Sequence, residues 1–139
     1  MTRTELLQFM RSHSLAVQAS VVGMVVSDDL YVFFDTVDTS RKVHNLRLNP
    51  KISFVIGGWQ KGDERTVQYE GIADEPRGKE LEALKELYFS RFPDERERQS
   101  WPDLLYIRAK PTWIRYSDFN QTPAEIVEFD FSKTPNADC

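Results

Sequence analysis

The sequence predicts a mainly β protein with a largely antiparallel sheet and peripheral helices. Short β-rich segments follow one another along most of the chain, and only three segments have helical character. Strands do not alternate with helices as they do in a doubly wound parallel sheet, so neighbouring strands should be mostly antiparallel. A length of 139 residues with 40% hydrophobic residues is sufficient for one domain with its own core.

The first elements are a helix and two strands. Residues 3–12 form an amphipathic segment, and Thr2 and Glu5 before and within it have the spacing of a capping box. Residues 14–27 are β-rich and almost continuously apolar, which predicts a strand with no clear hairpin turn inside it. An Asp-Asp pair then indicates a tight turn before a second strand over Leu30–Phe34.

A short helix and two further strands make up the middle of the chain. The helix is expected over residues 40–48, where apolar side chains recur on one side and an Asn-Pro pair follows. Ile52–Ile56 predicts an apolar strand, and a Gly-Gly pair begins the loop after it. Thr66–Ala73 alternates in polarity, which is typical of a strand with one buried face.

The strongest helix prediction is Gly78–Phe92, where an apolar stripe recurs at helical spacing and Pro93 follows. Leu104–Tyr116 predicts a long strand interrupted near Pro111, and Ile126–Phe131 predicts a last short strand.

Composition narrows the class of protein. We expect a single domain over residues 1–131 and a flexible tail over residues 132–139. The net charge of −4 argues against a nucleic-acid partner, because binding to a phosphate backbone needs clustered positive charge. No apolar run approaches a membrane span and no secretory signal is visible, so a cytoplasmic protein is expected. The lone Cys139 and two isolated histidines predict no metal site.

The polar turn after the second strand is the strongest candidate for a ligand site. Thr39 or Ser40 can cap the short helix, where unpaired backbone N–H groups favour an anion, and Ser40 adds a hydroxyl group. Arg41 supplies a planar fork of donors and Lys42 a compact charge, and both suit phosphate oxygens. Asp35 and Asp38 would oppose an anion unless they point away. An ordinary capped surface helix with solvated charges explains the same residues.

An ordered set of motifs extends from Leu30 to Ile72. It comprises LYVFFDT, SRK, NLRLNP, ISFVI and RTVQYEGIA, in that order. This set resembles the FMN-binding split β-barrel family related to pyridoxamine 5′-phosphate oxidase, and the resemblance covers most of residues 5–118. It implies a pyridoxamine phosphate oxidase-like antiparallel split β-barrel with FMN as cofactor. The residues that it places against the flavin phosphate are Thr36, Ser40, Arg41 and Lys42.

The resemblance further implies a homodimer with the flavin at the subunit interface. Trp113 and Arg115 share one strand face, and the corresponding strand of the family can approach the partner's flavin. Trp113 would then stack and Arg115 would reach an anionic ring edge; a rim aromatic beside a solvated arginine is the alternative. Leu30–Phe34 and Ile52–Ile56 are apolar on both faces, which calls for a covering helix or a second subunit.

Two departures from the family pattern matter. The usual first hairpin turn is not visible, so that hairpin is shortened or absent. The residues after WIRYSDF show no equivalent of the segment that contacts substrate in pyridoxamine 5′-phosphate oxidases, so that particular activity is not expected.

The resemblance therefore implies an FMN-dependent oxidoreductase of unknown small-molecule substrate, with NADPH or NADH as a candidate hydride donor. No catalytic side chain is assigned. The alternatives are a flavin-binding sensor or stress module without turnover, and a related barrel that binds a deazaflavin or haem.

Overall fold

The structure is a computed structural model that describes residues 1–17 and 21–131. Three α-helices, one 3-10 helix and eight strands are found in these residues. In chain order they are α1 (Arg3–Arg11), β1 (Leu15–Val17), β2 (Val21–Gly23), β3 (Val25–Val26), β4 (Val32–Val37), α2 (Arg41–Leu48), β5 (Lys51–Gly57), β6 (Arg65–Asp74), α3 (Gly78–Arg91), η1 (Pro93–Ser100), β7 (Leu104–Asp118) and β8 (Glu125–Asp130).

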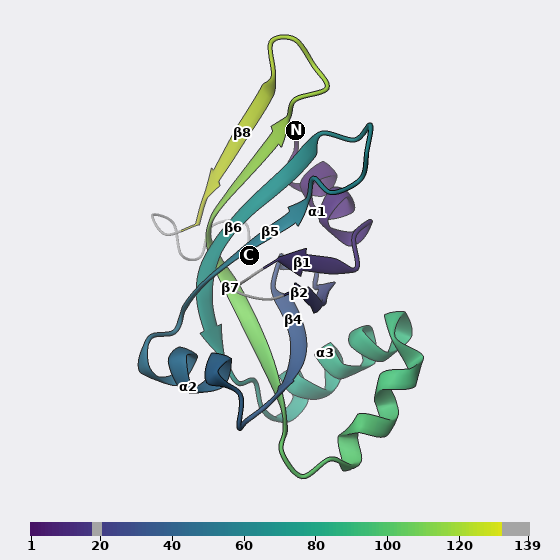
Figure 1. Cartoon of the computed structure of the whole chain (residues 1–139), viewed down its shortest axis with the longest axis vertical. Helices are drawn as coiled ribbons and strands as arrows, with labels where there is room; N and C mark the ends of the chain where they lie inside the picture. The colour runs from purple at the N-terminus through teal and green to yellow at the C-terminus, as the bar shows by residue number, and fades with distance from the viewer. Residues whose placement is uncertain (18–20, 132–139) are drawn as a thin grey trace.

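One antiparallel sheet contains all eight strands, in the order β2-β1-β5-β6-β7-β4-β3, with β8 also paired with β7 (Figure 1). The two ends of this path, β2 and β3, are separated in sequence by Met24 alone. The sheet therefore curls until its ends meet in one chain segment, and no pair of described strands closes it by hydrogen bonds. This confirms the predicted mainly β, split-barrel fold with peripheral helices.

β7 is the longest strand and has different neighbours along its two edges. One edge pairs with β6 from Arg108 to Asp118, while the other pairs first with β4 and then with β8. The change falls at Pro111 and Thr112, where the register with β6 shifts between Glu70 and Gly71. The interruption predicted near Pro111 is thus a β-bulge within a continuous strand. A Cβ on Gly71 would stand 2.4 Å from the Lys110 carbonyl oxygen, so only glycine fits there.

The main core fills the barrel and includes the buried face of β6. The predicted alternation of this strand is confirmed, with Val67, Tyr69 and Ala73 buried. The Tyr69 hydroxyl lies 2.7 Å from the Leu30 carbonyl oxygen and 3.0 Å from that of Ala109, and donates between them. This shared hydrogen bond connects β6, β7 and the β3–β4 turn inside the barrel.

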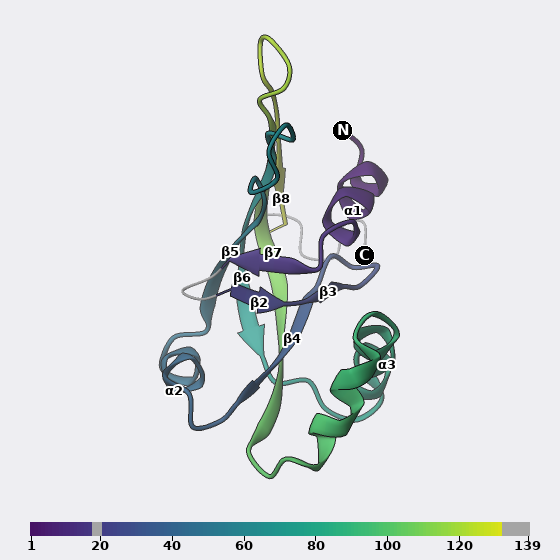
Figure 2. The same ribbon diagram turned by 45° about the vertical axis from the view of Figure 1, so that its right-hand side comes forward.

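A second, smaller core lies outside the barrel beneath α3 (Figure 2). Val32 and Phe34 of β4 point into the main core, whereas Phe33 packs under α3 against Tyr88 and Phe89. The covering layer that β4 requires is therefore a helix of the same chain. β5 differs: its inward residues are buried, but the outward Val55 is 40% exposed.

α1 and α3 begin at the predicted residues, and α2 begins one residue later than predicted, at Arg41. Thr2 Oγ1 accepts a hydrogen bond from the Glu5 N–H at 3.1 Å and Glu5 Oε2 accepts one from Thr2 N–H at 2.8 Å, which is the capping box expected for α1. α3 ends at Arg91, one residue before the predicted end, and η1 begins at Pro93. None of the helices in the described ranges has the length and apolar character of a membrane span.

The single strand predicted over residues 14–27 is wrong. Three short strands replace it, and β1 pairs with β2 in a hairpin with Leu15 opposite Gly23. The first hairpin is therefore short rather than absent; residues 18–20, which connect its strands, and the predicted tail over residues 132–139 lie outside the described residues. Leu30 also leaves the predicted strand, because it adopts φ 66° and donates its N–H to Ser27 in the turn before β4.

We predict that Gly71→Ala lowers the free energy of unfolding by roughly 1–3 kcal/mol, as overpacking does. The new methyl group would meet the Lys110 carbonyl oxygen at 2.4 Å, and a backbone atom cannot rotate away. Urea unfolding measures the effect. Gly23→Ala is the matched control, because its Cβ would meet only the Phe92 ring at 3.4 Å; equal losses in the two variants would contradict the bulge argument.

Candidate functional site

Two hydroxyl groups meet where β4 passes into α2. Ser40 is the N-cap of α2, and its Oγ accepts a hydrogen bond from the Val43 N–H at 3.3 Å. Thr36, near the end of β4, places its Oγ1 3.4 Å from the same Ser40 oxygen. The structure thus brings these two predicted residues together at a helix start, where backbone N–H groups lack intrahelical partners.

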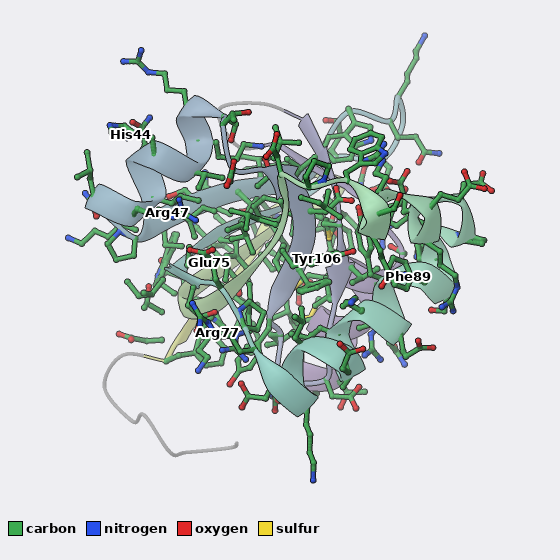
Figure 3. All side chains as sticks on the ribbon, turned by 90° about the horizontal axis from the view of Figure 1, so that it is seen from below. His44, Arg47, Glu75, Arg77, Phe89 and Tyr106 are labelled. Atoms are coloured by element: carbon green, nitrogen blue, oxygen red, sulfur yellow. The ribbon has the colours of Figure 1, made fainter. Side chains whose placement is uncertain are left out.

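Two cations follow at once in α2. Arg41 is exposed, whereas Lys42 is partly buried with its Nζ 5.4 Å from the centre of the Phe34 ring, and this burial lowers the pKa of its ammonium group. Neither has a carboxylate partner in residues 1–17 and 21–131. By contrast, Arg47 at the far end of α2 pairs with Glu75 at 3.2 Å (Figure 3).

The nearest carboxylate of β4 points away from this cluster. Strand alternation places Asp35 on the face opposite Thr36. Its Oδ1 lies 3.3 Å from an Arg98 nitrogen of η1, and its side chain is only 8% exposed. Asp38 is exposed. Asp35 therefore points away from the proposed anion site, as that site requires.

Trp113 lies on the outward face of β7, as the strand alternation predicts, while Ile114 points into the core. Its partners in register are Glu70 on β6 and Asp130 on β8. These three residues and Thr112 line a shallow cavity of about 380 Å³. No residue of α2 lines it, so one chain does not bring Trp113 and the start of α2 into this cavity.

Arg115 occupies the next outward position of β7. It lies opposite Gln68 and Glu128 in register. Its Nε is buried and has no hydrogen-bond partner among the described residues.

A third group of side chains lines a cavity that the sequence does not indicate. His13 follows α1, and its ring contacts the Trp59 ring at 5.9 Å between centres and 88° between planes. Both line a cavity of about 450 Å³. No sequence signal could have found this site, because Trp59 lies in the loop after β5 and local spacing does not relate the two. In the described ranges, no group of three or more His, Cys, Asp or Glu side chains is arranged to hold a metal ion.

An ion pair forms part of the same cavity wall. Arg65 donates from Nη2 to Asp63 Oδ2 at 2.6 Å and from Nε to Asp63 Oδ1 at 2.7 Å. Its guanidinium carbon lies 5.0 Å from the centre of the Phe9 ring. These charge-assisted hydrogen bonds lower the pKa of Asp63 to about 2.

Comparison with known proteins relates the chain to one family. Residues 12–118 match the family model described as pyridoxamine 5′-phosphate oxidase. A search of curated protein sequences gives no match.

Several solved structures share the fold at low sequence identity. A haem-binding protein from Mycobacterium smegmatis is 13% identical, with a TM-score of 0.75 over 94% of this chain and 58% of its own length. A haem storage protein from Vibrio cholerae is 15% identical, with a TM-score of 0.64 over 91% of this chain and 92% of its own length. General stress protein 26 from Bacillus anthracis is 16% identical, with a TM-score of 0.65 over 91% of this chain and 98% of its own length. The chain thus spans little more than half of the mycobacterial protein.

We predict that Asp63→Asn lowers the free energy of unfolding at neutral pH by no more than about 1 kcal/mol, since the pair is partly solvated. The folded-state pKa of Asp63 is about 2, below the unfolded value of about 3.9. The ion pair of Asp63 with Arg65 therefore makes its full contribution to the free energy of unfolding above about pH 4. That contribution disappears as the pH falls to about 2. Thermal unfolding of both proteins across this range tests it; a difference that does not change with pH would refute the assignment.

Proposed function

The chain belongs to the pyridoxamine 5′-phosphate oxidase family, and on this premise we propose that it binds FMN and acts as a cytoplasmic flavin-dependent oxidoreductase on a small molecule. The observation that carries the proposal is the group at the start of α2. There the hydroxyls of Thr36 and Ser40 lie 3.4 Å apart, next to Arg41 and Lys42, which have no carboxylate partner among the described residues.

This group fits a phosphate dianion. Backbone N–H groups at the start of α2 and the two hydroxyls supply donors, and the two cations supply charge. Burial lowers the pKa of Lys42, and a bound dianion would oppose that shift by favouring the charged amine. Asp35 does not interfere, because Arg98 holds it on the other face of β4.

The isoalloxazine ring would lie between two copies of the chain. Bound FMN supplies the redox chemistry itself, so the protein has only to hold the ring, exclude water and admit a hydride donor such as NADPH or NADH. In a dimer, the partner's Trp113 would stack on the ring. The partner's Arg115 would offer its guanidinium charge to an anionic edge of the ring.

The outward face of the sheet supports a homodimer. Val55, Ile72 and Ile126 lie on this face of β5, β6 and β8, and each is 40–45% exposed. β4 does not require a second subunit to cover it, because α3 of the same chain packs on its outward face. A stable homodimer would cover the sheet face and bury more than roughly 2,000 Å² in total.

Two alternatives to an FMN enzyme can be distinguished by experiment. A flavin-binding stress or sensor module would bind FMN without turnover, as the likeness to a general stress protein suggests. A deazaflavin or haem could replace FMN, and the haem-binding proteins of similar fold favour haem over deazaflavin. The visible spectrum of the purified protein separates the cofactors, and reduction by NADPH or NADH followed by turnover with an acceptor separates enzyme from module.

We predict that Arg41→Ala combined with Lys42→Ala reduces FMN affinity towards that for riboflavin, which lacks the phosphate. Loss of each charge-assisted contact should cost about 10- to 150-fold in affinity. Arg41→Lys should also weaken FMN binding, because a point charge cannot replace a two-pronged donor. Fluorescence titration with both flavins measures these changes.

The control for this experiment lies on the same helix. Arg47→Ala removes a cation of α2 that is already paired with Glu75, so FMN affinity should not change. If the double variant binds FMN as tightly as the parent, the cations are solvated helix charges and the phosphate assignment is wrong.

We predict that the parent is a dimer in solution and that Val55→Lys shifts it towards monomer, because the new charge would be buried in the interface without a partner. Light scattering at micromolar concentration measures the mass. Leu48→Lys is the control, since Leu48 is 76% exposed on α2 and lies off the sheet face. A monomeric parent would remove the shared-site proposal.

A further inference from the structure

His13 is packed as a fixed part of the wall of the cavity of about 450 Å³. Its Nδ1 lies 3.0 Å from the Phe9 carbonyl oxygen and 3.1 Å from Ser12 Oγ. The backbone of Gly57 lies close to its other ring nitrogen, because a Cβ built there would stand only 3.3 Å from Nε2. Contacts on both sides thus hold the imidazole in place, and it supports the Trp59 ring, which meets it at 88°.

Trp59 is the large aromatic side chain of this cavity, and 48% of it is exposed. It follows Gly57 and Gly58, whose φ angles of 83° and 90° lie in the left-handed region that favours glycine. Packing against His13 explains where the indole ring lies. It does not explain why so much of this apolar surface is left in contact with water beside polar groups. A ligand that stacks on the indole ring would cover it.

An ion pair gives the cavity hydrogen-bonding groups without net charge. Asp63 and Arg65 both line it and are joined by two hydrogen bonds of 2.6 and 2.7 Å. In the described ranges no hydrogen bond involves Arg65 Nη1, so its N–H groups can donate to a ligand. Gln60 adds an amide that both donates and accepts. Because each charge already has its partner, a neutral polar ligand fits this wall better than an ion does.

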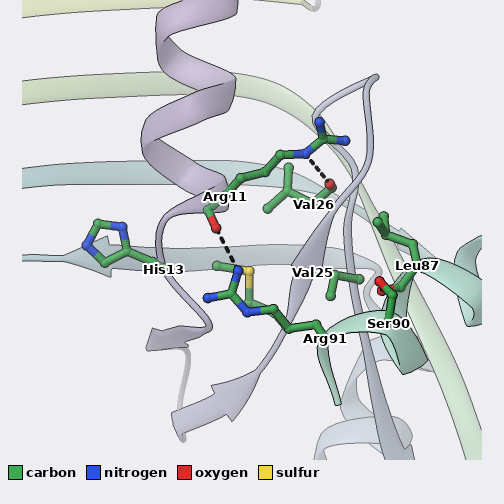
Figure 4. A pocket seen from close by; sticks show the side chains of 8 residues that line it. Arg11, His13, Val25, Val26, Leu87, Ser90 and Arg91 are labelled. Carbon is green, nitrogen blue, oxygen red and sulfur yellow. Dashed lines mark hydrogen bonds between the residues drawn. The ribbon is translucent and has the colours of Figure 1, made fainter. Parts of the chain in front are cut away.

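A smaller cavity of about 190 Å³ lies nearby, between α1, β3 and α3. Figure 4 shows that the imidazole of His13 points away from it. Its two guanidinium groups are directed at backbone carbonyl groups: Arg11 donates to that of Val26 at 3.1 Å and Arg91 to that of Arg11 at 2.8 Å. Each arginine ends a helix, where a cation offsets the partial negative charge of the last carbonyl groups. The fold itself therefore accounts for the polar groups of the smaller cavity.

The wall of the larger cavity restricts the class of ligand. The cavity is open and mostly polar, so a ligand gains little there from burial of apolar surface. It must be held by stacking on one face and by hydrogen bonds around its rim. A sugar ring has this form, since C–H groups give it an apolar face and each hydroxyl group at its rim both donates and accepts. A flat base is less suited, because no second ring among the described lining residues lies parallel to Trp59.

We propose that this cavity binds a neutral sugar ring, with Trp59 stacked on one face and the Asp63–Arg65 pair bonded to hydroxyl groups at its rim. The cavity volume of about 450 Å³ lies within the usual range of small-molecule sites, roughly 300–1,000 Å³. The cavity shares no lining residue with the flavin site proposed above, so the two assignments can succeed or fail separately.

Titration of the full chain with D-glucose, D-galactose and D-mannose tests the proposal. At least one of these sugars should saturate a single site at millimolar concentration and change the tryptophan fluorescence. Tetrahydropyran, the same ring without hydroxyl groups, should not bind, because only stacking would remain to hold it. Glucose 6-phosphate should bind no more tightly than glucose, and prior addition of FMN should leave sugar binding unchanged.

Two variants with matched controls locate the site. Trp59→Ala should weaken sugar binding at least about fivefold, because the stacking face is lost. Trp101→Ala is its control, since Trp101 is 51% exposed and does not line the cavity. Asp63→Asn should weaken binding about 10-fold, as loss of a charge-assisted hydrogen bond does. Glu75→Gln is its control, because it breaks an ion pair with Arg47 outside the cavity and should leave sugar binding unchanged.

Failure of all three sugars to bind the parent at concentrations up to about 100 mM would overturn the proposal. Equal binding of tetrahydropyran, tighter binding of the phosphorylated sugar, or competition by FMN would also contradict it. So would a loss of sugar binding in Trp101→Ala instead of Trp59→Ala. The titrations of the parent do not depend on whether any variant folds.

Discussion

The bulge of β7 opposite Gly71 is the constraint on which the rest of the structure depends. Up to Ala109, β7 is a barrel strand paired with β4, and from Trp113 it is part of an outer hairpin paired with β8. Pro111 has no N–H to donate, so it fits the point where one neighbour ends and the next begins. The bulge allows the strand to serve both partners, and only glycine on β6 leaves room for the Lys110 carbonyl group.

β4 shows how one strand can serve two purposes through alternation. Its outward residues hold the second layer: Phe33 packs under α3 and Asp35 pairs with Arg98 of η1. Its inward residues lead to Thr36 and the start of α2. Side chains alternate between the two faces of β4. The same alternation therefore lets the outer helices dock and turns the Asp35 carboxylate away from the anion site. A shift of the β4 register by one residue would bury Asp35 in the barrel and turn Thr36 to the outer face.

The start of α2 and the cavity beside His13 are built in different ways. The start of α2 is built from a contiguous stretch, so its hydroxyls and cations are placed by the turn and the helix cap alone. The cavity beside His13 needs the end of α1 and the loop that carries Trp59. Its imidazole is oriented locally by Phe9 and Ser12, but its surroundings come from residues more than forty positions away.

Features that depend on short-range pattern could be predicted from the order of residues. The capping box at Thr2, the alternation of β6, the helix stop before Pro93 and the Thr36–Lys42 cluster all follow from residues close together in the chain. Tertiary structure alone decided the short β1–β2 hairpin, the cover of Phe33 by α3 and the cavity beside His13. The physical reason is that periodicity reveals which face of an element is apolar, whereas the partner that buries that face, or completes a cavity, is selected by contacts distant in sequence.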